Sequence, residues 1–390
     1  MTVQAARDES REWSAPRSRP TLDHFKIRRS NPVIWDNPSL LHSATLTYPT
    51  DPRTLWRMTI RDRGQDMRRR LFMAAVAAAI ALPAGAQTIT LNGASQFSDD
   101  HAFTKAMVRF EELVKKYYGK PINFVLHKNS ALGLEKQYFE YMAQGKAVDY
   151  AIVSPAHMST FSKAAPFIDA PFLFRDLDHW NKVLDADVLK PVADEINQKA
   201  EVMLIGYAGG GTRNIFANKP VKNMAELKGL KVRVQGAPIW SKTFAAAGMA
   251  PTVIAYNEVY NAIQNGVIAA GENEAAGVEQ MKFFEVAPSL NMTQHAITIR
   301  PLCFSTKTFN KLPKDLQEAI VRAGKEAGAY GRQIESSEDT AKLDALEKAG
   351  KLKRIPFADR AAMKKAVDPV MAEYAKEIGA EQLLAKINAL

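Results

Sequence analysis

Two arginines stand where a charged side chain is unusual, and both could bind an anion. Arg233 lies within the apolar stretch Lys231–Val234, which is typical of a strand packed in a sheet. A guanidinium in such a place needs an anion or several acceptors, because burying it unpaired is very costly, and its planar fork suits a carboxylate. Arg213 directly follows the glycine run 209–211. Two interpretations stay open for each: ligand binding, or an internal salt bridge for Arg233 and a solvated loop cation for Arg213.

The chain after residue 87 lacks the residue patterns of common enzymes. Its histidines show no paired metal-ligand spacing, and no GxSxG nucleophile elbow is present. The run 209–211 lacks the Gly-Lys-Ser/Thr ending of phosphate-binding loops. Cys303, the only cysteine, lies between apolar residues, which indicates a buried side chain and excludes an internal disulfide. We therefore predict a protein that is not an enzyme and has no cofactor and no metal. The five histidines concerned are His101, His127, His157, His179 and His295.

Short apolar runs alternate with amphipathic stretches from residue 88 onward, which predicts βα units around a largely parallel sheet. Strands are expected at 88–92, 122–126 and 148–153, with helices at 101–118 and 134–143 between them. A long helix at 178–198 and a strand at 202–207 follow. The glycine-rich segment 208–212 is then expected to form a flexible break where one lobe passes the chain to another.

The same alternation resumes beyond the break, which predicts a second α/β lobe. The segment 296–304 is long for one strand and contains Pro301, so we expect a bent segment that crosses between the lobes. From Pro313 to the C-terminus the periodicity is helical. In the second lobe, strands are expected at 231–234, 252–254 and 267–270, and helices at 239–247, 256–264 and 274–284.

Four segments, taken in order and spacing, resemble the solute-binding proteins of tripartite ATP-independent periplasmic (TRAP) transporters of the DctP type. They are 208–214 (AGGGTRN), 227–236 (LKGLKVRVQG), 256–263 (YNEVYNAI) and 266–274 (GVIAAGENE). The resemblance covers residues 87–390. It implies a Venus-flytrap fold of two lobes around a cleft, a long helix spanning both, and closure on a small organic acid that is delivered to membrane permease subunits. We expect lobe I at 87–210 plus about 299–338, and lobe II at 211–298 plus about 339–390.

The resemblance also implies roles for four residues. Arg233 matches the family's arginine that clamps the ligand carboxylate, and Arg213 matches a second cleft arginine. Asn273 matches the asparagine of an E-N-P motif whose amide supports the carboxylate. Here Glu274 replaces the proline. A carboxylate facing the cleft would accept hydrogen bonds from ligand hydroxyls and repel a second ligand carboxylate, whereas a first-turn helix residue would only face solvent.

Four further residues are weaker candidates for the site. Tyr256 aligns with an aromatic residue of the cleft, but a core tyrosine is an equal alternative. Glu135 and Gln96 fall where loops of the first lobe approach the ligand, although Glu135 also suits a first helical turn. Ser154 follows the third strand, where open α/β sheets usually meet ligands, or it caps the next turn.

Residues 67–86 form an export signal inside the chain, with three arginines, an apolar run of about a dozen residues and an Ala-Gly-Ala cleavage site. That run is shorter than the roughly 20 residues of a spanning helix, so we predict a periplasmic protein. Residues 1–66 are expected to be disordered or to result from a start codon placed too early. A nucleic-acid-binding arm is the alternative there.

Charge gives no support to nucleic-acid binding by the rest of the chain. Residues 1–86 carry 14 Lys and Arg against 8 Asp and Glu, so the net charge of +10 falls to +4 without them. We predict capture of a sugar acid, an aldonate or uronate, because Glu274 disfavours a diacid. Alternatives are a 2-oxo or 2-hydroxy acid, including aromatic ones flanked by Tyr256, Trp240 or Phe283, and, from other classes, a periplasmic α/β enzyme or a binding protein that feeds a sensor.

Overall fold

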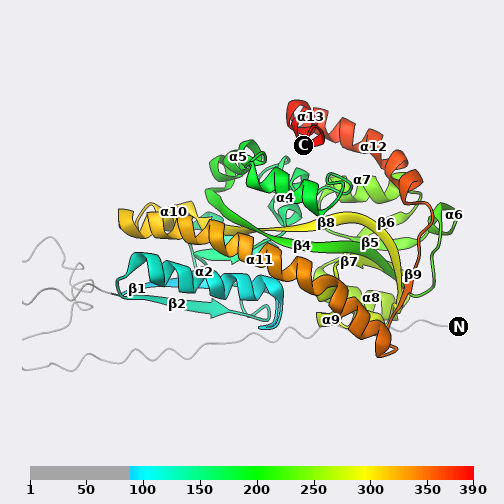
Figure 1. The fold of residues 1–390 in the computed structure, drawn as a ribbon, viewed down its shortest axis with the longest axis horizontal. Coiled ribbons are helices and arrows are strands. Elements are labelled where there is room, and N and C mark those ends of the chain that lie inside the picture. The colour runs from blue at the N-terminus through cyan, green and yellow to red at the C-terminus, as the bar shows by residue number, and fades with distance from the viewer. Residues whose placement is uncertain (1–87) are drawn as a thin grey trace, which may run out of the picture. The chain divides into compact units, whose positions relative to one another are not determined.

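The structure is a computed structural model that describes residues 88–390, so the predicted extension 1–66 and signal peptide 67–86 lie outside the described residues. One mixed sheet of nine strands forms the centre of this part, and helices pack around it (Figure 1). The strand order is β2-β1-β3-β8-β4-β7-β5-β6, and β9 pairs with β8. The strands are β1 Ile89–Ala94, β2 Ile122–His127, β3 Tyr150–Ile152, β4 Val202–Ala217, β5 Lys231–Val234, β6 Ala250–Val253, β7 Ala270–Asn273, β8 Ser289–Ser305 and β9 Lys353–Ile355.

The first predicted βαβαβ unit is confirmed. β1 pairs in parallel with β2 and β3, and the helices α2 (Ala102–Tyr118) and α3 (Glu135–Gln144) connect them. The His101 side chain accepts a hydrogen bond from the Phe103 backbone N–H and so caps α2, while Gly119 ends the helix in a left-handed conformation (φ 64°). The buried face of α2 packs Phe103, Met107 and Phe110 into one core with β1 and β3.

The second predicted α/β unit is confirmed in outline. β5 pairs in parallel with β6 and β7, and the three strands follow one another along the chain as predicted. β7 begins three residues later than predicted, because Val267 is exposed and belongs to the preceding turn. The helices here are α6 Met224–Leu227, α7 Pro238–Ala246, the turn η4 Tyr256–Glu258, α8 Val259–Gln264, α9 Ala275–Gln280 and the turn η5 Phe283–Glu285.

The predicted break at 208–212 is wrong, because these residues lie inside the 16-residue strand β4. β4 pairs along its length with the 17-residue strand β8, and the two strands join the first unit of the sheet to the second. Gly209 and Gly210 have φ values of 120° and 117°, and the register of the β4–β8 ladder shifts three times along the pair. The glycines therefore permit bulges without ending the strand.

The predicted helix 178–198 is two helices, α4 (Leu177–Asp185) and α5 (Lys190–Ala200). Asp187 between them has a positive φ of 51°, and Pro191 lies in the first turn of α5, where proline is tolerated. The long helix of the fold is instead α11 (Lys314–Lys348), with 35 residues. It packs against β4 and α2 and, further along, against α9 (Figure 1).

Glycines bring α11 unusually close to β4. A Cβ atom on Gly206 would lie 2.1 Å from the backbone oxygen of Gly324, and one on Gly328 would lie 2.6 Å from the backbone nitrogen of Tyr207. Helix and strand therefore touch through backbone atoms.

The remaining elements are the turns η2 Pro155–Met158 and η3 Ala165–Phe167 and the helices α10 Thr306–Phe309, α12 Arg360–Glu377 and α13 Glu381–Asn388. Within residues 88–390, no helix has both the length and the hydropathy needed to cross a membrane.

Candidate ligand-binding site

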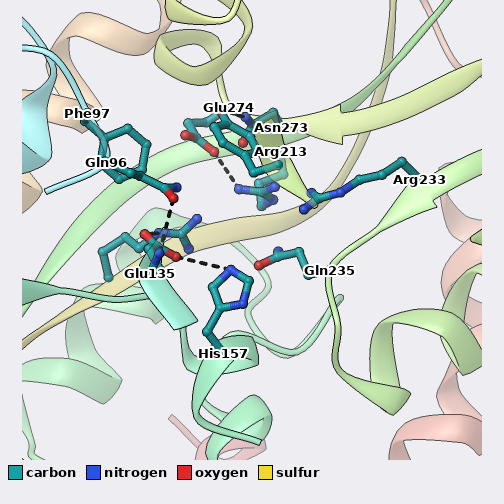
Figure 2. A pocket seen from close by; sticks show the side chains of 11 residues that line it. Gln96, Phe97, Glu135, His157, Arg213, Arg233, Gln235, Asn273 and Glu274 are labelled. Carbon is teal, nitrogen blue, oxygen red and sulfur yellow. Dashed lines mark hydrogen bonds and ion pairs between the residues drawn. The ribbon is translucent and has the colours of Figure 1, made fainter. Parts of the chain in front are cut away.

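A small pocket lies where the ends of several strands meet β4 and β8 (Figure 2). The enclosed space at its centre is about 10 Å³, which is room for about one water molecule. All lining residues except His157 and Tyr256 are buried, so a ligand reaches them only when the site opens. The lining residues are Gln96, Phe97, Glu135, His157, Arg213, Arg233, Gln235, Tyr256, Asn273, Glu274 and Arg300.

Arg233 extends from β5 into this pocket without a carboxylate partner. Its Nε donates to the Ile254 backbone oxygen at 2.9 Å, and no Asp or Glu of residues 88–390 lies within 4 Å of its guanidinium nitrogens. The side chain is 4% exposed, and burial lowers the pKa of Arg233 to about 10, which the charge of Glu272 opposes only in part. The alternative interpretation, an internal salt bridge of Arg233, is not found among the described residues, and the guanidinium fork is available to an anion.

Arg213, in contrast, is fully engaged by protein carboxylates. Its Nε and Nη2 bind both oxygens of Glu272, at 2.6 and 2.9 Å, and its Nη1 binds Glu274 at 2.5 Å. Burial alone would lower the pKa of Arg213, but the charges of Glu272 and Glu274 raise it above its ordinary value. Arg213 is therefore no solvated loop cation. It lies in β4, and the pairing of β4 with β7 brings Glu272 next to it.

Glu272 is the centre of a buried polar network that the sequence did not reveal. One of its oxygens lies 3.3 Å from His295 Nε2, and His295 Nδ1 lies 2.9 Å from the hydroxyl of Thr293. Burial alone would raise the pKa of Glu272, but the Arg213 guanidinium lowers it to about 2. The network holds Arg213 in place.

Glu274 and Asn273 line the pocket from the end of β7, as expected (Figure 2). Glu274 is the residue before α9 and is 1% exposed, so it does not point to solvent. Its Oε2 accepts hydrogen bonds from Arg213 and from Thr298, and its charge is therefore matched within the protein. Asn273 donates from its amide to the Tyr256 hydroxyl at 3.0 Å, and the Tyr256 ring lies 5.7 Å from the Arg233 guanidinium.

Gln96 and Glu135 lie across the pocket from Arg233 (Figure 2). Glu135 is the first residue of α3 and is 1% exposed; one of its oxygens accepts from the Ser154 backbone N–H at 3.0 Å. Burial raises the pKa of Glu135, and Arg300 opposes this effect. Ser154 does not line the pocket. Its hydroxyl lies behind the lining, 2.8 Å from the amide oxygen of Gln235.

Four lining residues were not predicted: Phe97, His157, Gln235 and Arg300. Arg300 carries the same signal as Arg233, a charge within an apolar strand, and could have been found by it. Burial and the charges of Arg233 and Arg300 lower the pKa of His157 to about 3, so its ring is neutral near pH 7. Trp240 and Phe283, considered as flanks for an aromatic ligand, are core residues that stack on Phe244 and Phe216.

The charges and polar groups of the pocket suit an anionic ligand. Among residues 88–390, no group of three His, Cys, Asp or Glu side chains is placed to hold a metal ion. On one side of the pocket lies Arg233, a cation with no carboxylate partner among the described residues, and on the other side lie polar donors and acceptors.

Comparisons with known proteins agree with this geometry. The sequence pattern of the bacterial extracellular solute-binding proteins, family 7 (DctP), matches residues 93–377. A solute-binding protein of Sulfitobacter sp. (strain NAS-14.1) is 51% identical over 316 residues, which are 81% of this chain and 96% of that protein.

Two crystal structures of TRAP periplasmic solute-binding proteins are also similar. One, from Sulfitobacter sp. NAS-14.1 with bound alpha-D-taluronate, is 51% identical with a TM-score of 0.76, over 77% of this chain and 97% of that one. The other, from Roseobacter denitrificans OCh 114 with bound L-galactonate, is 26% identical with a TM-score of 0.71, over 77% and 99% of the two chains.

Proposed function

Because this chain belongs to family 7 of the bacterial extracellular solute-binding proteins, the DctP family, we propose that it captures a sugar-acid anion, a uronate or aldonate, and delivers it to the membrane permease subunits of a TRAP transporter. It is a TRAP solute-binding protein and not an enzyme. Relatives of this kind are periplasmic, and export through the signal at 67–86 is part of the proposal.

One observation carries the choice of ligand class: Arg233 is a buried guanidinium with no carboxylate of its own. A ligand carboxylate would supply the missing charge and accept two parallel hydrogen bonds. We assign the carboxylate clamp to Arg233, support of the carboxylate to Asn273 and Tyr256, and positioning to Arg213. Contacts to the rest of the ligand are assigned to Glu274, Glu135 and Gln96, with Ser154 behind them.

Polar groups around the remainder of the pocket favour a hydroxylated ligand. Glu135, Gln96, Gln235 and His157 offer acceptors and donors on the side away from Arg233, and an apolar or aromatic acid would leave them unpaired. The taluronate and L-galactonate bound by the two related proteins are both hydroxylated acids with a single carboxylate.

Closure of two lobes around the ligand is also proposed, with lobe I at 87–210 plus about 299–338 and lobe II at 211–298 plus about 339–390. The burial of nearly all lining side chains supports this step, since entry requires opening. A ligand that contacts both lobes favours the closed form by its difference in affinity for the two forms.

A thermal-shift and calorimetric screen tests the proposed function. Sugar acids, C4-dicarboxylates and 2-oxo acids are each added to the purified protein, and a ligand at a hundred times its Kd stabilises it by roughly 2.7 kcal/mol. We expect hits among uronates or aldonates, and loss of these hits in Arg233→Ala. Hits confined to dicarboxylates, or no dependence on Arg233, would contradict the proposal.

A further inference from the structure

Two polar atoms in the pocket have no partner although both are buried. Glu135 Oε1 and Arg300 Nε each lack a hydrogen bond within the described residues. They lie 3.6 Å apart, which is within the distance of an ion pair but too far for a hydrogen bond between them. Leaving a buried donor or acceptor unsatisfied costs roughly 1–3 kcal/mol, and a ligand group that bonds to both atoms would remove this cost.

Other contacts hold the two side chains apart. Glu135 is held through its second oxygen, Oε2, by the Ser154 backbone N–H at 3.0 Å, and the same oxygen lies 3.4 Å from His157 Nε2. Arg300 donates from Nη1 to the Ile299 backbone oxygen at 3.3 Å, and its guanidinium lies 5.4 Å from the centre of the Phe103 ring. Arg300 Nη1 also lies 4.0 Å from Asp169 Oδ2, so both side chains have further contacts on the sides that face away from each other.

The pair therefore suits a ligand group that both accepts from Arg300 and donates to Glu135. A hydroxyl group does both. A carboxylate accepts from Arg300, but it has no proton to donate to Glu135 and is repelled by the charge of Glu135. An ammonium group donates to Glu135, but it cannot accept from Arg300 and is repelled by the charge of Arg300. A methyl group leaves both atoms unpaired. Gln235 Nε2, also unpaired and in the same pocket, adds a donor for a neighbouring hydroxyl.

We propose that Arg300 and Glu135 together recognise hydroxyl groups at the end of the ligand remote from its carboxylate, and so select hydroxylated monoacids against diacids. This inference rests on the proposed function, because it takes the carboxylate to be bound at Arg233 on the other side of the pocket. In this inference, Glu135 and not Glu274 disfavours a diacid, because Arg213 already neutralises the charge of Glu274 at 2.5 Å.

Four acids that share one carbon skeleton test the inference. L-Galactonate, D-galacturonate, galactarate and L-fuconate differ at the carbon remote from the shared carboxylate, which is a primary alcohol, an aldehyde carbon in its hydrated or ring form, a second carboxylate and a methyl group, respectively. Calorimetry on the wild-type protein should show L-galactonate or D-galacturonate binding at least about tenfold more tightly than galactarate and L-fuconate.

Variants then assign this preference to the pair. Arg300→Met and Glu135→Gln should bring the Kd ratio of L-fuconate to L-galactonate to within about threefold of 1, and Glu135→Gln should also improve galactarate binding. Arg109→Met, at an exposed arginine on α2, is the control and should keep the wild-type ratio. Arg300→Lys provides a second readout if Arg300→Met does not fold.

Each outcome separates the two proposals. If a water molecule fills the gap instead, wild-type protein binds L-galactonate and L-fuconate equally, and the inference is overturned. An unchanged ratio in folded Glu135→Gln and Arg300 variants, with binding still lost in Arg233→Ala, overturns the inference and leaves the proposed function standing. If none of the four acids nor any other sugar acid binds, both are overturned.

Discussion

Replacing Arg233 and Arg213 with methionine should change the stability of the unliganded protein in opposite directions. The pKa of Arg233 is about 10, against 12.5 for an unperturbed arginine, because burial lowers it and the charge of Glu272 opposes this only in part. At roughly 1.4 kcal/mol for each tenfold change, the net cost of keeping this cation in the pocket is on the order of 3 kcal/mol. Methionine removes that cost but also the bond to the Ile254 oxygen, worth about 1 kcal/mol. We expect Arg233→Met to raise the free energy of unfolding by roughly 1–2 kcal/mol.

The same change at Arg213 removes the partner of two buried carboxylates. Glu272 and Glu274 would remain in the protein interior without the guanidinium that binds both. Breaking a buried ion pair from one side typically costs about 3–5 kcal/mol, so Arg213→Met should lower the free energy of unfolding by that amount or prevent folding.

Urea denaturation without ligand, followed by calorimetry with D-galacturonate, measures both effects. Arg233→Met should be the more stable protein and should lose about 2–5 kcal/mol of binding free energy, because the ligand carboxylate loses its partner. If Arg233→Met is destabilised as strongly as Arg213→Met, Arg233 is a structural residue, and the reasoning that it waits unpaired for a ligand is refuted.

Three further predictions concern acid sensitivity, packing and motion. Burial lowers the pKa of His101 to about 3, so protons bind the unfolded chain preferentially and the free energy of unfolding falls as the pH drops below about 6.5. His101→Asn keeps the helix cap, and between pH 7.5 and pH 5 it should lose about 2 kcal/mol less of this free energy than the wild-type protein. Urea titration measures the difference, with His127→Asn as the control. Gly206→Ala places a methyl group 2.1 Å from the Gly324 oxygen and should lower the free energy of unfolding by more than about 2 kcal/mol. Gly236→Ala, whose new methyl group would have its nearest contact at 3.8 Å, is the control and should not lower it. Equal melting temperatures of the two variants would contradict this prediction. Small-angle scattering should show a smaller radius of gyration at saturation with a sugar acid, and an unchanged profile would argue for a rigid pocket.

The alternating units of the fold could be predicted because their signal is local. The helix 101–118 shows its apolar face and its ending glycine in the sequence itself, and it forms as α2. The glycine run 209–211 was misread, because its role depends on a distant element: glycine lets α11 approach the middle of a continuous strand. The break between α4 and α5 had a local signal, Pro191, which the helical periodicity around it concealed.

The site could be predicted where a single residue contradicted its surroundings. Arg233 was noticed as a cation in an apolar strand, and Arg300 shows the same contradiction in β8 but was overlooked beside Pro301. The pairing of Arg213 with Glu272 could not be read from the chain, because the two residues are 59 positions apart and meet only through the register of β4 and β7. Whether an arginine is free or engaged is a property of the sheet, and the sequence alone left both possibilities open.

The bulges in the β4–β8 ladder coincide with the ligand site. Two of the three register shifts fall between Gly209 and Ile215, the segment that also carries Arg213. A bulge disrupts the pairing of two strands locally and bends the strand that carries it. If the two lobes close as proposed, the β4–β8 connection between them therefore bends next to the bound anion. Affinity then depends on the stiffness of these strands as well as on direct contacts, and substitutions that never touch the ligand can change how long it stays bound.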